Sequence, residues 1–461
     1  MDQNSPLKSL DELYRKNSKE ALKDYFTFLS FESVSSEPAY QPEMTRCVMW
    51  LKDYIEKIGL KCELWTTPGH PTLFASWMGA GPDKPTFLIY NHYDVQPVDP
   101  IGEWITPPFE PTIRDGQVYA RGAQDNKGQC FYVLQALKML FERDKCLPIN
   151  IKLCIEGEEE CGSHGLTDIL DERQEQLKAD YLAIVDLGMK SPNQPALTLG
   201  LRGITTMDVE FIGSNSDMHS GEHGGIAFNP IHALIQTLDK LRDSSGKIMV
   251  PGFYDDVTPL DPAELHQLAT DFDHSEYKKT FAADPTGGEK EFSPLERGWT
   301  RPTLEINGIT GGYSGKGFKT VIPAKASAKI SCRLVPDQDP EVIAENVADF
   351  INENVPEGVK VQVTLHPGGG VPMRSSPASK VVKAFSQAFE EVYKVPCQYI
   401  LAGGSIPVTA KLAQASKSEV VLFGLGLADD HIHAPNEHFG LDRLEKGALA
   451  MARGIELLGT I

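Results

Sequence analysis

The stretch Ile151-Lys-Leu-Cys-Ile-Glu-Gly-Glu-Glu-Glu-Cys-Gly-Ser163 joins an apolar, β-prone run to a cluster of acids. The run stops at Glu156-Gly157, three carboxylates follow in a row, and Gly162-Ser163 closes the segment. Adjacent carboxylates repel each other, and burying them is costly unless they are paired or bind a cation. An acidic triplet alone is more often a solvated turn after a strand, so a cation site here depends on the rest of the chain.

Length and composition describe an ordinary globular protein and exclude some partners. The 461 residues suggest two or three domains, and 41% apolar residues allow a substantial core. The net charge of −20 argues against nucleic acid or an anionic membrane as a partner, because both need basic patches. The eight cysteines form no CxxC pair and several lie in apolar runs, which is typical of reduced core residues in a cytoplasmic protein. We expect neither a signal peptide nor a membrane span, because the first residues lack a basic and an apolar region and no apolar run is long enough.

Strands and helices alternate in the first part of the chain. Apolar residues at helical spacing predict helices, and continuous apolar runs predict buried strands. The predicted helices are residues 18–30, 44–58 and 128–141, and the predicted strands are residues 86–90, 149–155 and 181–185. Gly59 stands where the second helix should end. Apolar strands separated by helices favour a sheet that is covered on both faces.

The pattern changes after Arg202-Gly203. Residues 207–211 and 326–334 alternate between apolar and polar side chains, as half-exposed strands do. Helices starting at Asn229-Pro230 and covering 342–351, followed by a strand at 359–365, complete the order strand-helix-strand, strand-helix-strand. This order predicts a ferredoxin-like α+β domain, which residues 251–303 interrupt as a long excursion.

From Ser376 the earlier pattern returns. It predicts a helix at 379–393, a strand at 419–423 and a last helix around 444–458. The simplest interpretation is an α/β domain made of residues 1–202 and 374–461, with a smaller domain of residues 203–373 inserted in it. We therefore predict an α/β fold in which a mixed sheet is flanked by helices, with an inserted ferredoxin-like α+β domain.

Acidic or imidazole side chains stand at the ends of several predicted elements of the α/β domain. They are His92 and Asp94 after strand 86–90, Asp125 before helix 128–141, Glu159 and Glu160 after strand 149–155, Asp186 after strand 181–185, and His433 beyond strand 419–423. Ligands of open α/β sheets gather at the carboxyl ends of strands, so these side chains can meet in one crevice. Each of them alone is an ordinary turn or cap residue, and His431 and His438 are alternatives to His433.

The donor set suits divalent metal ions. Two imidazoles and three carboxylates, with one carboxylate to spare, fit Zn²⁺ as the first choice and Mn²⁺ or Co²⁺ as alternatives. If one carboxylate bridges, two ions ~3.5–4 Å apart can each take one His and one terminal carboxylate. The spare Glu would then be the general base, and Asp94, two residues after His92, would orient its imidazole.

Segments over nearly the whole chain carry a family resemblance. They are Asn91–Pro97, Gly122–Gly128, Glu156–Ser163, Val185–Asp186, Met218–Gly221, Lys319–Pro323, Ser331–Pro336, Gly403–Pro407 and His433–Glu437. In these segments the chain resembles the di-metal exopeptidases and amidohydrolases, the family of carnosinase, glutamate carboxypeptidase, aminoacylase and succinyl-diaminopimelate desuccinylase. It is most similar to the carnosinase-like, cytosolic dipeptidase branch, and the segments come in the family's order.

The resemblance implies a role for each residue of the α/β domain. Asp125 would bridge two ions, with His92 and Asp186 completing one site and Glu160 and His433 completing the other. Glu159 would be the base that takes a proton from metal-activated water. The resemblance also implies a cis peptide bond between Asp125 and Asn126.

The resemblance extends to the inserted domain, which would serve as a lid and as the interface of a homodimer. His219 would reach over the active site and polarise the scissile carbonyl, although without the resemblance it reads as a surface histidine. Arg333 would hold the substrate carboxylate by a bidentate contact. Thr320, Gly404 and Ser405 would make further substrate contacts.

One position departs from the dipeptidase branch. That branch commonly reads Arg-Glu-Gly-Gly-Ser-Ile-Pro, where the Glu pairs with the free amino group of the substrate, whereas this chain has Leu401-Ala402-Gly403-Gly404. We expect a hydrolase that cleaves the amide bond of dipeptides or similar small substrates with a free carboxylate. An N-acyl-amino-acid deacylase is the alternative that Ala402 supports. An inactive metal-binding protein is disfavoured because Glu159 is present.

Overall fold

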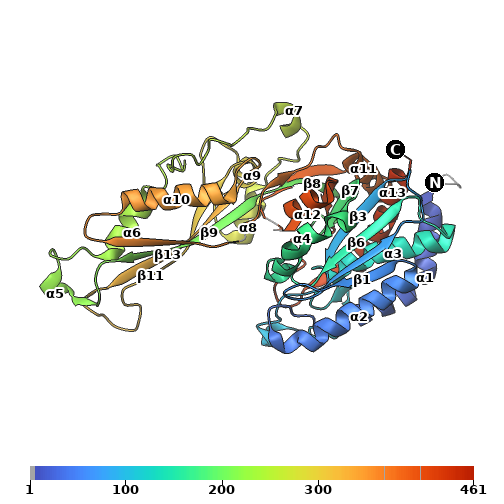
Figure 1. Ribbon diagram of the computed structural model, residues 1–461, viewed down its shortest axis with the longest axis horizontal. Helices are drawn as coiled ribbons and strands as arrows, with labels where there is room; N and C mark the ends of the chain where they lie inside the picture. The colour runs from blue at the N-terminus through green and yellow to red at the C-terminus, as the bar shows by residue number, and fades with distance from the viewer. Residues whose placement is uncertain (1–5, 368, 405, 407, 461) are drawn as a thin grey trace. The chain divides into compact units, whose positions relative to one another are not determined.

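The computed structural model describes residues 6–367, 369–404, 406 and 408–460 (Figure 1). The chain divides into two compact units, each described below by itself. Unit 1 consists of Met1–Leu199, Ser375–Ile400 and Val408–Ile461, and unit 2 of Gly200–Arg374 and Leu401–Pro407. The boundaries expected from the sequence, 202/203 and 373/374, lie close to these. Residues 401–407, which the sequence placed in the α/β domain, cluster with unit 2 instead.

Unit 1 is built around a mixed sheet. Its strands lie in the order β1 (Lys61–Trp65), β2 (Thr72–Trp77), β6 (Asn150–Glu156), β3 (Thr86–His92), β7 (Tyr181–Val185), β17 (Glu419–Phe423) and β8 (Ala196–Leu201). The four strands from β6 to β17 are parallel, and the outer pairings are antiparallel. Two short strands, β15 (Met373–Arg374) and β16 (Gln398–Ala402), also pair with β8. The parallel strands bring their carboxyl ends to one edge of the sheet.

Helices cover both faces of this sheet, and every residue of β6 and β7 is therefore buried. The helices are α1 (Pro6–Leu29), α2 (Gln41–Ile58), α3 (Lys127–Asp144), α4 (His164–Leu177), α11 (Lys380–Tyr393), α12 (Val408–Ser416) and α13 (Leu441–Leu458). They pack as two groups, one of α4 with α12 and one of the other five. Gly59 ends α2 with φ +122°, as the sequence predicts. None of the helices that the structure describes is long and apolar enough to cross a bilayer.

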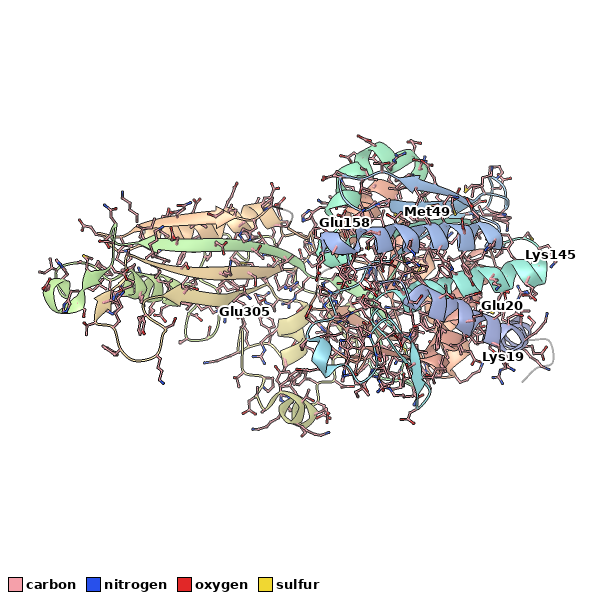
Figure 2. The ribbon with its side chains drawn as sticks, turned by 90° about the horizontal axis from the view of Figure 1, so that it is seen from below. Lys19, Glu20, Met49, Lys145, Glu158 and Glu305 are labelled. Carbon is pink, nitrogen blue, oxygen red and sulfur yellow. The ribbon has the colours of Figure 1, made fainter. Side chains whose placement is uncertain are left out.

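The first helix is longer than predicted, because it begins at Pro6 and not at residue 18. Leu10 and Tyr14 of the added turns are buried, whereas Lys19 and Glu20 are exposed and point outward (Figure 2). Unit 1 also contains the short helices η1 (Pro38–Tyr40), η2 (Ile101–Glu103) and η3 (Glu159–Cys161). A small sheet joins β18 (His438–Gly440), β5 (Gln117–Tyr119) and β4 (Thr112–Arg114).

Unit 2 contains a four-stranded antiparallel sheet in the order β11 (Thr303–Gly311), β13 (Lys325–Leu334), β9 (Gly203–Ile212) and β14 (Lys360–Leu365). The helices α6 (Pro230–Asp239) and α10 (Pro340–Asn354) pack against it. The chain order β9-α6-β11-β13-α10-β14 is the predicted ferredoxin-like order. The shorter elements are β10 (Met218–His219), β12 (Val321–Ile322), α5 (Ser220–His223), α7 (Pro262–Leu265), α8 (His274–Phe281) and α9 (Pro294–Trp299). The predicted excursion at 251–303 therefore contains α7, α8 and α9.

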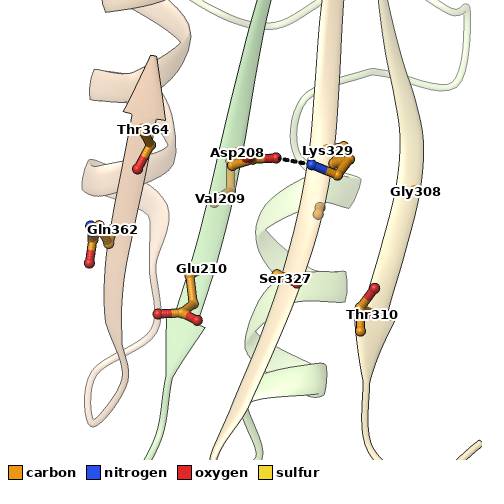
Figure 3. A pocket seen from close by; sticks show the side chains of 10 residues that line it. Asp208, Val209, Glu210, Gly308, Thr310, Ser327, Lys329, Gln362 and Thr364 are labelled. Carbon is orange, nitrogen blue, oxygen red and sulfur yellow. Dashed lines mark hydrogen bonds and ion pairs between the residues drawn. The ribbon is translucent and has the colours of Figure 1, made fainter. Parts of the chain in front are cut away.

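The two faces of the unit 2 sheet differ in polarity. Buried and partly exposed residues alternate along β9, with Met207, Val209 and Phe211 in the core under the helices. The opposite face is polar and forms an open hollow of about 380 Å³ (Figure 3). There the Lys329 ammonium donates a hydrogen bond of 2.8 Å to Asp208. Ion pairs between exposed groups of this kind stabilise a fold only slightly.

Candidate metal centre

Three adjacent parallel strands of unit 1 end in the predicted site residues. His92 is the last residue of β3, Asp186 directly follows β7, and η3 after β6 carries Glu159 and Glu160. Asp125 lies in the loop before α3, and His433 lies in the loop between β17 and β18. Their side chains meet in one cluster at the carboxyl edge of the sheet.

Asp125 lies between the two imidazoles of the cluster. Its Oδ1 is 3.1 Å from Nε2 of His92, and its Oδ2 is 3.0 Å from Nε2 of His433. The same nitrogen of His92 is 3.6 Å from Asp186 Oδ1, and that of His433 is 3.2 Å from Glu160 Oε2. Each oxygen of Asp125 therefore faces a different imidazole and its own terminal carboxylate, which is the arrangement that two neighbouring cations would need.

Glu159 joins the cluster beside His92. The ligand atoms of His92, Glu159 and Asp186 lie within 4.8 Å of one another, and so do those of His92, Asp125 and Glu160. Geometry alone therefore allows Glu159 to be either a ligand or a base next to the ligands.

The electrostatics of the cluster call for positive charge. Burial raises the pKa of Glu159 well above its usual range, raises that of Asp186, and raises that of Glu160 to about 7. Burial acts in the same direction on Asp125, but hydrogen bonds from the two imidazoles outweigh it and lower its pKa. Hydrogen bonds to Asp125 and Glu160 raise the pKa of His433 to about 10. Without cations, burial favours protons on Glu159, Glu160 and Asp186, and bound cations would favour their charged forms instead.

One atom of the cluster has no partner of its own. Oε1 of Glu160 is buried and accepts no hydrogen bond from the described residues. A buried carboxylate oxygen without a donor is costly, and a cation would remove that cost. Together with two imidazoles and several carboxylates, this orphaned oxygen fits divalent metal ions of the Zn²⁺ type.

Asp94 supports the cluster from behind and is fully buried. Its Oδ1 lies 3.2 Å from Nδ1 of His92, which leaves Nε2 to face Asp125. It also accepts hydrogen bonds from the backbone amides of Glu159 at 3.3 Å and Glu160 at 3.1 Å. The Ser35 hydroxyl donates to its Oδ2 at 2.7 Å. Asp94 thus orients His92 and the η3 turn together.

Asn126 is a supporting residue to which the sequence gave no role. The peptide bond between Asp125 and Asn126 is cis, as the resemblance implies. The Asn126 amide donates to Asp186 Oδ1 at 2.6 Å and to the carbonyl of Val185 at 2.8 Å. Asn91 in turn donates to Oδ1 of Asn126 at 2.7 Å. Both asparagines stand in the motifs quoted above, but only the fold shows which groups they touch.

The structure decides between the competing histidines. The ring of His438 stacks on Tyr119 with centroids 4.7 Å apart, and His431 meets His438 edge-on at 5.6 Å. Among the described residues, His433 is the one of the three that contacts the carboxylates of the cluster. Glu158, the first acid of the triplet, instead accepts a hydrogen bond of 3.0 Å from the amide of Gly165 in α4.

The remaining predicted residues belong to unit 2. His219 ends β10, is exposed, and accepts a hydrogen bond of 3.0 Å from the Gly221 amide through its Nδ1. Thr320 and Gly404 are exposed, and Arg333 lies on β13 opposite Thr303 of β11. Burial lowers the pKa of Arg333. Ser405 lies outside the described residues.

Arg202 is a unit 2 residue that the sequence did not single out. Its Nε donates to the carbonyl of Gly403 at 3.0 Å, and its backbone amide donates to the carbonyl of Ala402 at 3.3 Å. Arg202 therefore holds the segment in which Ala402 replaces the acid of the dipeptidase branch.

A mixed α/β sheet that presents imidazoles and carboxylates at the carboxyl ends of its parallel strands is the framework of a metallohydrolase. The profile of Peptidase family M20/M25/M40 matches residues 88–457, and the chain belongs to this family. It is therefore a hydrolase of a metallopeptidase family that uses divalent metal ions, and the resemblance found in the sequence is confirmed.

Relatives of known structure or name match the chain over nearly its full length. The chain is 33% identical over 461 residues to the Cys-Gly metallodipeptidase dug1 of Schizosaccharomyces pombe, covering 95% of this chain and 96% of that protein. It is 32% identical over 445 residues to the Beta-Ala-His dipeptidase of Homo sapiens, covering 92% and 87%. The crystal structure of the M20 family metallo-carboxypeptidase Sso-CP2 from Sulfolobus solfataricus aligns with a TM-score of 0.85 and 33% identity, covering 96% of this chain and 100% of that one.

Proposed function

We propose that the protein is a metal-dependent dipeptidase that hydrolyses the amide bond of small peptides with a free carboxylate. The observation that carries this proposal is the cluster in which Asp125 faces His92 and His433 while Glu159 lies beside His92 and Asp186. Two relatives that match over most of the chain are named as dipeptidases, which supports the same substrate class.

In this proposal the cluster holds two ions, with Zn²⁺ as the first choice and Mn²⁺ or Co²⁺ as alternatives. His92, Asp125 and Asp186 are the ligands of one, and Asp125, Glu160 and His433 are the ligands of the other. Bound divalent ions supply Lewis acidity, which polarises a carbonyl and makes water a better nucleophile at neutral pH.

The chain's own residues move the proton. Burial and the negative charges of Asp186 and Glu160 raise the pKa of Glu159, which makes it a stronger base than an ordinary glutamate. It would take that proton from the attacking water and give it to the leaving amine. Asp94 keeps Glu159 in place through the backbone amide of Glu159 itself.

The roles in unit 2 stay proposals drawn from the resemblance. Residues 203–373 would act as a lid and dimerisation domain of a homodimer, with residues 1–202 and 374–461 as the catalytic domain. His219 would polarise the scissile carbonyl, and Arg333 would bind the substrate carboxylate. Thr320, Gly404 and Ser405 would contact the substrate, and a cytoplasmic location stays a prediction from the cysteines.

A second candidate, the N-acyl-amino-acid deacylase, is favoured by one observation. A substrate with a free amino group needs an acid to pair with it, and Ala402 cannot be that acid. Two acids near His433 in the sequence, Asp429 and Asp430, are candidate replacements. Asp430 is fully buried and pairs with Arg443 through both oxygens at 2.5 and 2.6 Å, which leaves Asp429, an exposed residue, as the candidate.

Kinetics on two matched substrate panels test the proposal. We expect free dipeptides to exceed their N-acetylated and N-succinylated counterparts in kcat/KM if the dipeptidase function is right. The reverse order would support the deacylase. In the deacylase case Ala402→Glu should shift the preference toward free dipeptides by about tenfold or more, as one charged hydrogen bond of roughly 1.5–3 kcal/mol would. Ala402→Gln is the control for side-chain size without charge, and no turnover on either panel would contradict both functions.

A further inference from the structure

Glu437 is a fully buried carboxylate four residues after His433. It does not belong to the cation cluster, and its two oxygens accept hydrogen bonds from another segment of the chain. Oε1 accepts from the backbone amides of Gln124 at 2.9 Å and Asp125 at 3.0 Å. Oε2 accepts from the amide of Gly122 at 2.8 Å and from Arg121 Nη1 at 2.8 Å.

These contacts fix the loop that carries Asp125. Residues 121–125 form no helix or strand, and backbone carbonyls accept from the amides of Arg121 and Ala123. Glu437 supplies acceptors for the other three amides, including that of Asp125 itself. The backbone carbonyl of Glu437 also accepts a hydrogen bond of 3.1 Å from the amide of Ala120, so both the main chain and the side chain of Glu437 bind this segment.

The same side chain couples two distant ligands. His433 and Glu437 share one loop, and the Oδ2 of Asp125 lies 3.0 Å from Nε2 of His433. The position of Asp125 relative to His433 therefore depends on the carboxylate that joins their segments. Since Asp125 also faces His92 at 3.1 Å, a displaced Asp125 would disturb both sides of the cluster.

We propose that Glu437 is the positioning residue that sets Asp125 between the two halves of the metal centre. A carboxylate suits this role better than an amide, because all four partners are donors. In a glutamine, the side-chain NH₂ group would replace one of the two oxygens. At least two of the four donors would then face another donor and lose their acceptor. The proposal concerns metal affinity, so it can be tested apart from the substrate of the enzyme.

Glu437→Gln in the full-length protein is the test variant, with Zn²⁺ as the probe. Chelator competition on the metal-free protein gives the dissociation constants of both zinc equivalents, and thermal denaturation of the metal-free protein reports folding. Outer partners of metal ligands typically contribute 10–100-fold to metal affinity. We expect both zinc equivalents to weaken by at least tenfold, because Asp125 faces both imidazoles.

Two control variants separate positioning from a general loss of stability. Glu289→Gln removes a buried carboxylate that pairs with Arg301 at 2.7 and 2.9 Å in unit 2, and should lower the melting temperature without changing zinc affinity. Gln96→Ala removes a 2.8 Å hydrogen bond to Glu160 Oε2, and should weaken one zinc equivalent only. If metal-free Glu437→Gln is not folded, Glu437→Asp is measured in the same way and should weaken both equivalents.

The outcomes are distinct. Weakening of both equivalents in the Glu437 variant, beyond the effect of Glu289→Gln, supports the proposal. Zinc affinities within threefold of the unchanged protein, or a loss confined to one equivalent as in Gln96→Ala, would overturn it.

Discussion

The substitution Glu159→Gln tests the assignment of the general base most directly. It removes one negative charge and one proton acceptor while keeping the size of the side chain. General-base catalysis typically contributes 10²–10⁴-fold, so we expect kcat to fall by about that factor, which corresponds to about 3–5 kcal/mol. The structure favours the upper end, because Glu160 and Asp186, the neighbouring carboxylates, are proposed ligands of the two ions. A carboxylate that binds a cation is a weaker base than a free one, so neither should replace Glu159.

The assay combines turnover with metal content. Steady-state kcat and KM on the best dipeptide are measured for the unchanged protein and the variant after both are loaded with metal, and bound metal is counted by elemental analysis. We expect two ions in both proteins, because Glu159 is not one of the proposed ligands. Glu158→Gln is the matched control, since Glu158 is bonded to the Gly165 amide and not to the cluster, and it should keep most of its turnover.

Two results would refute this reasoning. A variant that keeps more than a tenth of the turnover would show that another group takes the proton. A variant that loses metal in parallel with activity would show that Glu159 is a ligand, which its closeness to His92 and Asp186 permits.

Three further substitutions test other parts of the structure. Asp125→Ala should lose both ions, because its two oxygens face the two imidazoles, and one full equivalent retained in elemental analysis would contradict the bridge. His219→Ala should lower kcat more than it changes metal content, and sedimentation of the unchanged protein as a fully active monomer would contradict the predicted homodimer. Arg453→Met should cost about 0.5–1 kcal/mol of unfolding free energy at pH 7, because Arg453 pairs with Glu391 at 2.6 Å between α13 and α11. Burial raises the pKa of Glu391, but the hydrogen bond from Arg453 outweighs it and lowers this pKa in the folded state. The pair therefore stabilises the fold at pH values above the ordinary pKa of 4.5. In urea denaturation, the loss of unfolding free energy caused by Arg453→Met should shrink as the pH falls below that value.

Most of the unit 1 sheet could be predicted because its strands are continuous apolar runs. Residues 181–185 and 419–423 are strands with the predicted bounds, since both faces of the sheet are covered and every position except Glu419 is buried. The start of α1 was missed because residues 6–17 are mostly polar. Only a few apolar residues, such as Leu10 and Tyr14, mark the buried side of that part of the helix.

The short helices of residues 251–303 were missed for a different reason. They are too short to show an apolar period, and local capping defines them instead. Asp261 and Asp273 cap α7 and α8, and Ser293 with Glu296 forms a capping box at α9. These caps stand in the sequence, so attention to the Asp261-Pro262 and Ser293-Pro294 pairs would have indicated where α7 and α9 begin.

The side chains that meet in the cluster could be predicted because strand ends carry a sequence signal, and so could the contact of Asp94 with His92, whereas the other supporting contacts could not. Glu437 could be read from the sequence only as part of a motif, because its partners are mainly backbone amides, which every residue has. The same holds for Asp94, whose bonds to the amides of Glu159 and Glu160 depend on how two loops meet. Such contacts become visible only in three dimensions.

The two supporting acids follow one pattern. Asp94 stands two residues after His92 and holds the turn of Glu159 and Glu160, and Glu437 stands four residues after His433 and holds the loop of Asp125. Each histidine segment thus supplies a buried carboxylate that fixes the irregular segment of another ligand. Because the Asp125 loop and the η3 turn are each held by an acid of another ligand segment, we infer that loosening one support disturbs ligands far from it in the sequence, and that metal binding and the order of these loops depend on each other.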